Sequence, residues 1–305
     1  MQKNVAYALM MLAAMIAAAN ASITVLALRS GAHPTEITFF GFVFASLIYL
    51  AFLGVVDRGS LTIKGRLLAP LLVFSFITGT LANLTWYMAI ERTSVAIAVG
   101  LYYTYPSLVT IGAIYLLGEK LNLQKGLALP MTFIGAFLVA GGAGLNNRLS
   151  FDIFGVILAL FTAVAGAVWY LWGKRLLMKN SANTVVLYTF LLSIPTAALI
   201  ANPIRIAQTS LSSVAWILIL MMGVQSVVIY ILSMVALKHI EASKASIITS
   251  IEPAVAVMIA YFVAAQTITG IQSVGIVLVF LGLLVLGLLE KPDSRSRSVP
   301  PEKRP

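Results

Sequence analysis

Long apolar runs follow one another along nearly the whole chain and are separated by short polar stretches. An α-helix needs roughly 20 predominantly apolar residues to cross a bilayer. The pattern predicts ten transmembrane helices, which we call spans one to ten, at residues 4–28, 34–56, 67–90, 93–117, 124–142, 151–173, 182–201, 211–237, 242–263 and 271–289. We therefore expect an all-α integral membrane protein with little room for a soluble domain.

Composition agrees with this pattern. Apolar residues make up 60% of the chain and charged residues 10%, and the mean hydropathy is +1.00. Soluble domains usually carry about 25% charged residues. Lys3 before an alanine-rich run is also compatible with a signal peptide, but the apolar run is too long and nine further spans follow it, so we expect an uncleaved first helix.

The charge distribution predicts the orientation of the chain. A net charge of +10 suggests nucleic acid as the partner of a soluble protein. If the N-terminus is cytoplasmic, however, all but four of the 20 Lys and Arg residues lie on the cytoplasmic side, and the four exceptions are Arg29, Arg92, Arg148 and Arg205. This asymmetry follows the positive-inside rule, so we expect both termini in the cytoplasm and a lipid bilayer, not nucleic acid, around the protein. Residues 291–305 are rich in Pro, Ser, Arg and Lys and are predicted to form a disordered cytoplasmic tail.

Two prolines indicate an internal duplication. Pro106 and Pro253 lie inside apolar spans and are 147 residues apart. The same shift superimposes spans one to five on spans six to ten, and it matches Glu119 with Gln266. Because five is an odd number, the second half must enter the membrane from the opposite side. We expect two inverted five-helix repeats, residues 1–145 and 151–290, around a central cavity, as is typical of secondary transporters.

The prolines also suggest where a substrate would pass. Proline has no N–H, so Pro106 leaves the carbonyl of Tyr102 without its helical partner, and Pro253 does the same for Thr249. Freed carbonyls at mid-membrane depth are tolerated only where protein or water satisfies them. They indicate either structural kinks or hinges at Pro106 and Pro253 beside a substrate cavity, and their matched positions in the two repeats favour hinges.

Glu252 is the acidic residue placed near the middle of a span. A charge there costs about 2.5–3.5 kcal/mol on insertion scales, so we expect the side chain to face a water-filled cavity or to stay protonated. Three roles stay open: pairing with a substrate ammonium group, carrying a coupling proton, or hydrogen bonding to neighbouring helices.

Other polar and aromatic residues favour spans one, three, four, six, eight and nine around the cavity, with spans five and ten facing lipid or a partner subunit. The candidate substrate-binding residues are Glu252, Asn20, Asn83, Trp86, Tyr102, Tyr105, Trp169 and Tyr230. Interhelical hydrogen bonding is the structural alternative for Asn20 and Asn83, and an interfacial aromatic belt is the alternative for Trp169. Glu119 and Lys120 are expected to cap the cytoplasmic end of span four.

Catalytic and metal chemistry find little support. The chain has no cysteine and two histidines, and neither a zinc-ligand pair at helical spacing nor a nucleophile–base motif stands out. We expect no metal, no cofactor and no enzymatic activity.

Several short motifs resemble the EamA family of the drug/metabolite transporter superfamily. They are Ala236-Leu237, Ala242-Ser243, Ala245-Ser246 and Ile251-Glu252-Pro253 in the second half, Trp169-Tyr170 followed by Lys174-Arg175 in span six, and Pro106 followed by Gly118-Glu119 in the first half. The resemblance covers about residues 4–290. It implies a ten-helix fold that works by alternating access in the bacterial cytoplasmic membrane and exports amino acids, related metabolites or drugs. Gln266 and Ala19-Asn20 depart from the family pattern, so the resemblance does not identify the substrate.

The leading hypothesis is therefore a secondary transporter that exports small metabolites, with aromatic or hydrophobic amino acids as the favoured class. A multidrug or organic-cation exporter is the alternative, and a channel or a membrane enzyme is less favoured. A monomer and a homodimer both fit the sequence.

Overall fold

The computed structural model describes residues 1–63, 65–93, 95–144, 152–201, 206, 209–264 and 268–288. Within these ranges the regular structure is helical, without strands. Nine helical segments of the described chain are long and apolar enough to cross a membrane, and α15 (Gly270–Leu288) is a shorter tenth. The predicted all-α, multi-pass membrane fold is confirmed. The predicted tail at 291–305 lies outside the described residues.

The spans differ in how regular they are. In the first half they consist of α1 (Lys3–Ala17) with α2 (Asn20–Arg29), α3 (Pro34–Val56), α4 (Gly65–Ser75) with a π-helix (Phe76–Leu81) and α5 (Ala82–Arg92), α6 (Val95–Tyr102) with α7 (Tyr105–Leu117), and α8 (Leu123–Gly144). In the second half they are α9 (Ile153–Leu177), α10 (Ala182–Ala201), α12 (Ser213–His239), α13 (Ala242–Thr249) with α14 (Glu252–Ala264), and α15. A short 3-10 helix (Arg58–Leu61) follows α3. Spans one, four and nine are therefore broken, and span three contains a π-helical turn.

Local capping explains where several spans begin. Helix α3 has Pro34 at its first position, and a capping box joins His33 and Glu36, whose carboxylate accepts the His33 backbone N–H at 2.9 Å. Asp152 accepts the Phe154 N–H at 2.9 Å at the start of α9. These caps satisfy backbone donors that would otherwise be unpaired near the membrane boundary.

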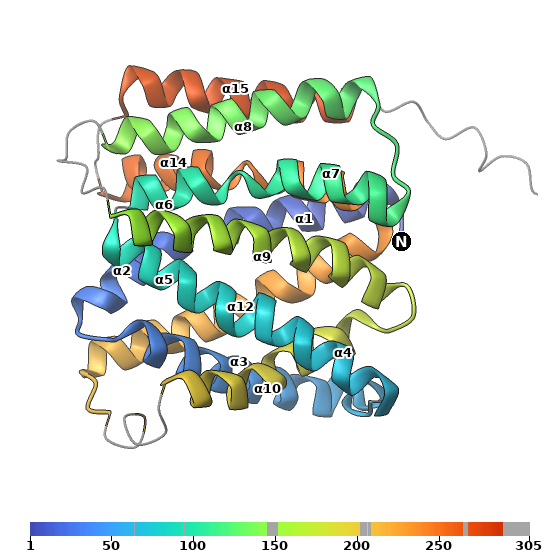
Figure 1. Ribbon diagram of the computed structural model, residues 1–305, viewed down its shortest axis with the longest axis vertical. Coiled ribbons are helices and arrows are strands. Elements are labelled where there is room, and N and C mark those ends of the chain that lie inside the picture. The colour runs from blue at the N-terminus through green and yellow to red at the C-terminus, as the bar shows by residue number, and fades with distance from the viewer. Residues whose placement is uncertain are drawn as a thin grey trace, which may run out of the picture.

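The two halves interleave. Helix α8 packs along α15 and α3 along α10, so spans five and ten, and spans two and seven, pair with their own counterparts. Helix α1 of span one packs on α12 of span eight, and α5 of span three packs on α9 of span six. The 147-residue shift converts the first of these pairs into the second. In Figure 1, α1 runs leftwards from the N-terminus, whereas its counterpart α9 runs from left to right. This arrangement is that of two inverted repeats.

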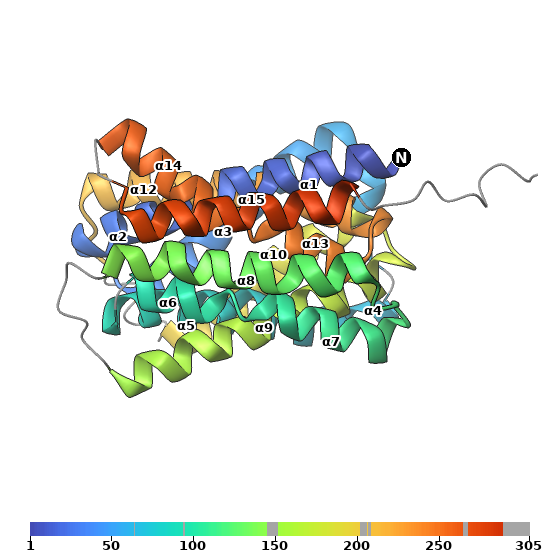
Figure 2. The same cartoon turned by 90° about the horizontal axis from the view of Figure 1, so that it is seen from above.

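The paired counterparts form the two edges of the molecule. In Figure 1, α8 and α15 lie at one edge and α3 and α10 at the other, with the remaining six spans between them. Figure 2 shows α8 and α15 side by side from above. We call the face of the bundle at which α1 begins the N-side, and the opposite face the far side.

Small residues let α8 and α15 approach closely. A Cβ atom on Gly135 would lie 2.7 Å from the carbonyl oxygen of Gly275, and one on Gly282 would lie 3.1 Å from that of Ala128. The 147-residue shift converts the first contact into the second. Spans five and ten therefore bury one face against each other, while apolar residues such as Phe137 and Leu284 remain exposed on the outer faces, as lipid contact requires.

Candidate functional site

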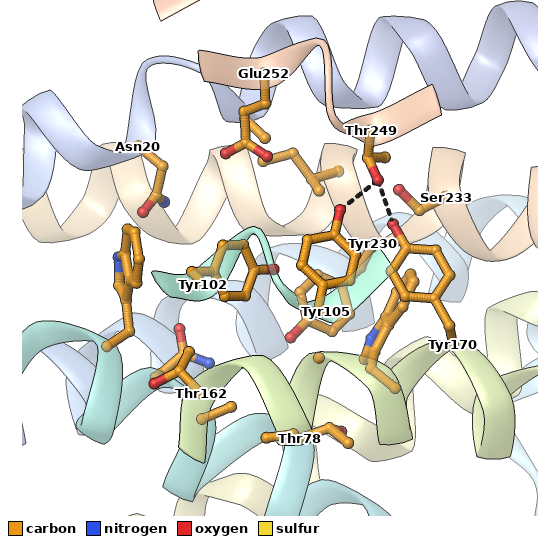
Figure 3. A pocket seen from close by; sticks show the side chains of 18 of the residues that line it. Asn20, Thr78, Tyr102, Tyr105, Thr162, Tyr170, Tyr230, Ser233, Thr249 and Glu252 are labelled. Carbon is orange, nitrogen blue, oxygen red and sulfur yellow. Dashed lines mark hydrogen bonds between the residues drawn. The ribbon is translucent and has the colours of Figure 1, made fainter. Parts of the chain in front are cut away.

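A cavity of about 210 Å³ lies in the middle of the bundle. Figure 3 shows the side chains that face it. They come from α1 and α2, from the π-helix and α5, from α6 and α7, and from α9, α12, α13 and α14. These elements are spans one, three, four, six, eight and nine, so the predicted set of cavity-forming spans is confirmed.

All eight candidate residues line this one cavity: Asn20, Asn83, Trp86, Tyr102, Tyr105, Trp169, Tyr230 and Glu252. Their role in binding a substrate stays a prediction. The lining also contains thirteen residues outside that set: Ala13, Ala14, Ala17, Thr78, Ala82, Thr162, Ala165, Gly166, Tyr170, Ser226, Ile229, Ser233 and Thr249. Thr249 was not among the residues predicted to line the cavity. The one sequence feature that could have indicated it is its position four residues before Pro253, where the span is interrupted.

The helix breaks occur at the two prolines. Span four is interrupted at residues 103–104 and span nine at residues 250–251, positions that differ by the 147-residue shift. Pro106 and Pro253 are the second residues of α7 and α14, which proline tolerates because no helical N–H is needed there. The breaks are thus confirmed, whereas hinge motion at them stays a prediction.

Hydroxyl groups add hydrogen bonds to carbonyls beside the two breaks. The Thr104 hydroxyl donates to the Leu101 carbonyl at 2.8 Å in span four. In span nine the Thr249 and Ser250 hydroxyls donate to the Ser246 carbonyl at 3.0 and 3.4 Å. Such local partners allow non-helical backbone at membrane depth.

Span one is broken without a proline. Gln225 of α12 donates to the carbonyl of Ile16, just before the break, at 2.6 Å, and the Asn20 amide donates to the Gln225 side chain at 3.4 Å. Asn20 therefore makes the interhelical bond considered from the sequence and also lines the cavity.

Span three places Asn83 through its π-helix. The Asn83 amide donates to the Gly79 carbonyl at 2.8 Å and accepts from the Tyr87 hydroxyl at 3.2 Å, so both bonds stay within the span. Interhelical bonding was the alternative for Asn83, and it is present as well, because the Asn83 side chain also interacts with the Tyr230 hydroxyl of span eight. π-Helical turns are frequent at functional sites.

Six aromatic rings form a continuous chain of contacts along the cavity: Trp86, Tyr102, Tyr105, Tyr170, Trp169 and Tyr230. Tyr105 and Tyr170 are stacked, with centroids 5.6 Å apart and planes 10° apart. Trp169 lines the cavity, and span six extends to Leu177, beyond its predicted end at 173.

Thr249 joins three spans at one side of the cavity. Its hydroxyl lies 2.5 Å from the Tyr105 hydroxyl and 2.9 Å from the Tyr170 hydroxyl (Figure 3). All three side chains are buried. The contact therefore ties spans four, six and nine together through one hydroxyl group.

Glu252 is the one charged residue among the described cavity-lining residues. Within the described chain it has no ion pair with Lys, Arg or His. A carboxylate in such low-dielectric surroundings attracts a cation strongly. Among the described residues, no group of three or more His, Cys, Asp or Glu side chains could hold a metal ion.

The indole nitrogen of Trp169 is buried and makes no hydrogen bond to any residue that the structure describes. A buried donor without an acceptor is costly and calls for a partner. An acceptor oxygen of a bound molecule would supply one.

Glu119 caps span four with its backbone and not with its side chain. Helix α7 ends at Leu117, the following Gly118 has a left-handed φ of 68° that suits glycine, and the Glu119 N–H donates to the Ala113 carbonyl at 3.1 Å. The Glu119 carboxylate reaches across to span nine, where it accepts the Ala242 N–H at 2.6 Å. The Lys120 carbonyl accepts from Lys125 at 3.1 Å.

Comparison with known proteins agrees with this architecture. A model of the EamA-like transporter family matches residues 4–141 and again residues 153–288. An uncharacterized transporter of Archaeoglobus fulgidus is 27% identical over 266 residues, which cover 87% of this chain and 90% of that protein. The uncharacterized transporter YxxF of Bacillus subtilis is 28% identical over 200 residues, which cover 65% of this chain and 63% of that protein.

A solved crystal structure has the same fold. It superimposes with a TM-score of 0.77 at 17% identity and covers 94% of this chain and 99% of its own. The two separate matches to the family model correspond to the two repeats seen in the structure. The chain is a multi-pass membrane protein that belongs to the EamA-like transporter family.

Proposed function

We propose that this protein is a secondary transporter that exports small metabolites bearing an ammonium group, with aromatic or hydrophobic amino acids as the leading class. The observation that carries the proposal is Glu252, the one carboxylate among the described residues that line a cavity walled by aromatic rings. The names of the related proteins support transport in general and say nothing of a substrate.

The cavity chemistry favours a substrate with a positive end and an apolar body. Glu252 would pair with the ammonium group, and the rings of Tyr102 and Tyr105 would pack against an apolar or aromatic side chain or a cation. The Trp169 N–H is a donor for a substrate carboxylate or carbonyl oxygen. No Lys, Arg or His is among the described lining residues, which disfavours a strongly anionic substrate.

In this proposal the N-side faces the cytoplasm of a bacterial cell, with both termini inside. The described cations of the N-side include Lys3, Arg58 and Arg175, whereas Arg29 and Arg92 lie at the far side. The positive-inside rule supports this orientation. The direction of transport, export, rests on the family resemblance.

An organic-cation exporter is the second candidate, because the same carboxylate and rings would also hold a cation that has no carboxylate. The two candidates differ in one measurable way. An amino-acid exporter prefers the amino acid over the amine formed by removing its carboxyl group, and an organic-cation exporter prefers the amine.

Reconstitution of the purified protein in proteoliposomes tests the proposal. Labelled leucine, phenylalanine and tryptophan, their decarboxylated amines, and cationic drugs would each be assayed with and without a pH gradient. Saturable counterflow of the amino acids is the expected result, and dependence on the gradient would indicate proton coupling. Movement of none of these compounds would contradict the proposed function, and movement without saturation would favour a channel.

A further inference from the structure

We infer that the Glu119 carboxylate is the latch of a gate that closes the cavity toward the N-side, and that Glu119 must release α13 when the gate opens. The latch concerns access to the cavity rather than the identity of the substrate. Its two halves belong to different repeats, because Glu119 follows span four and α13 begins span nine.

Glu119 caps α13 from outside its own repeat. One carboxylate oxygen accepts the Ala242 N–H at 2.6 Å, and the other accepts the Ser243 N–H at 3.3 Å and the Ser243 hydroxyl. These donors belong to the first turn of α13, where the unpaired N–H groups and the helix dipole favour a negative charge. The adjacent residue Glu241 makes no cap with its own side chain.

A buried lysine completes the latch. The Lys125 side chain is 1% exposed and the Glu119 side chain 8% exposed, with 3.2 Å between the ammonium and the carboxylate. Lys125 also reaches Glu241 at 3.5 Å, and Lys244 reaches Glu241 at 3.4 Å. Without Glu119, the buried Lys125 ammonium keeps the partly exposed carboxylate of Glu241 as its carboxylate partner among the described residues, so the closed state depends on Glu119.

The latch and the cavity wall act on the same two half-helices. Helix α7 runs from Tyr105 to the residues before Glu119, and α13 runs from Ala242 to Thr249. They are joined at the N-side by Glu119 and at the cavity by the bond between the Tyr105 and Thr249 hydroxyls. A substrate moving between the cavity and the N-side past this pair must separate both contacts.

The half-helix α13 is sealed along its whole length. Every residue from Ala242 to Thr249 is buried, and α13 packs on α7, α1, α8 and α9. The Lys174 ammonium holds the connection between α12 and α13, because it donates to the carbonyls of Leu237 and Ile240 at 2.7 Å each. The described conformation is therefore closed between α7 and α13.

Thiol labelling tests the latch without any knowledge of the substrate. The chain contains no cysteine, so Ser246→Cys places a single reporter in the buried middle of α13. The full chain would be labelled in proteoliposomes with a membrane-impermeant maleimide applied to the N-side. Adding Glu119→Gln should raise the labelling rate on the order of tenfold or more, because a charge-assisted cap and ion pair are lost.

Two controls make the outcome decisive. Glu241→Gln removes a carboxylate that contacts Lys125 and Lys244 but leaves the α13 cap intact, so it should raise the labelling rate far less than Glu119→Gln does. Ser193→Cys, buried against span three in α10, reports general loosening, and its labelling should not change with Glu119→Gln. The inference would be overturned if Glu119→Gln left Ser246→Cys protected, if Glu241→Gln exposed it equally, or if Ser193→Cys became labelled as fast. Each result is independent of whether amino acids are transported.

Discussion

The Thr249 hydroxyl lies 2.5 Å from the Tyr105 hydroxyl, where the broken ends of spans nine and four face each other. The same oxygen lies 2.9 Å from the Tyr170 hydroxyl. One threonine therefore connects the two repeats at the cavity wall and satisfies two buried phenols.

Thr249→Val keeps the shape of this side chain and removes its hydrogen bonds. We expect a loss of about 1–3 kcal/mol in the free energy of unfolding, because buried tyrosine hydroxyls lose their partner. Thermal unfolding in detergent measures the change. Thr110→Val is the matched control, since Thr110 is buried in α7 and, among the described residues, its hydroxyl bonds only to the Pro106 carbonyl of its own helix. Equal stability losses in the two variants would contradict the connecting role of Thr249.

Glu252→Gln tests the carboxylate that the proposed function requires. The amide keeps the size of the side chain but cannot pair with an ammonium group, so counterflow of amino acids and of amines should be abolished while expression and folding persist. Glu91→Gln, an exposed residue at the end of α5, is the control and should transport at the wild-type rate. Normal transport by Glu252→Gln would remove Glu252 from the site.

Trp169→Phe retains an aromatic ring and removes the unpaired indole N–H. If that donor meets a substrate oxygen, the apparent affinity for amino acids should fall about tenfold or more, whereas that for the decarboxylated amines should stay nearly constant. Trp172→Phe is the control, because Trp172 lies on the same helix but packs on Phe74 instead. Competition of unlabelled compounds in counterflow gives both affinities. A uniform change for acids and amines would argue against this contact.

Gly135→Ala tests the close approach of α8 and α15. The added methyl group would lie 2.7 Å from the Gly275 carbonyl oxygen and 2.8 Å from the Val279 backbone nitrogen, so the backbones must separate. We expect a destabilisation of about 1–3 kcal/mol by thermal unfolding. Gly141→Ala on the same helix meets nothing within 4 Å and should be neutral or slightly stabilising. A neutral Gly135→Ala would show that these helices are not closely packed.

Asp57 provides a pH-dependent prediction outside the membrane spans. Hydrogen bonds from Ser60 and Asn183 lower the pKa of its carboxyl below the ordinary value. Because the folded-state pKa is the lower one, this stabilisation is present above the unfolded pKa of about 4 and is lost as pH falls through the folded value. Ser60→Ala should therefore flatten the fall in melting temperature below about pH 4, with Ser30→Ala as control. Superimposable pH curves for Ser60→Ala and the wild type would refute this.

The features that the sequence predicted well are those with a local cause. Hydropathy located the spans to within a few residues, and prolines located the breaks in spans four and nine because proline removes a helical hydrogen bond wherever it lies. Glu252 was recognisable because charge is rare in a span. The cavity residues followed from the polar and aromatic positions of the same spans.

The features that were missed depend on distant partners. Glu119 and Ala242 are 123 residues apart, and nothing near Glu119 indicates that its carboxylate caps another repeat. The break in span one has no proline, and the carbonyl of Ile16 is satisfied by Gln225, 209 residues away. Such contacts are decided by how the repeats interleave and not by any local pattern.

The two halves differ in the regularity of these spans as well as in sequence. Helices α9 and α12 are unbroken, with 25 and 27 residues, whereas their counterparts, spans one and three, contain a break and a π-helical turn. The cavity wall thus combines two long unbroken helices of the second repeat with the interrupted spans one and three of the first repeat. Among related proteins, changes in substrate range are therefore expected to accumulate around Asn20 and Asn83, while α9 and α12 preserve a common frame.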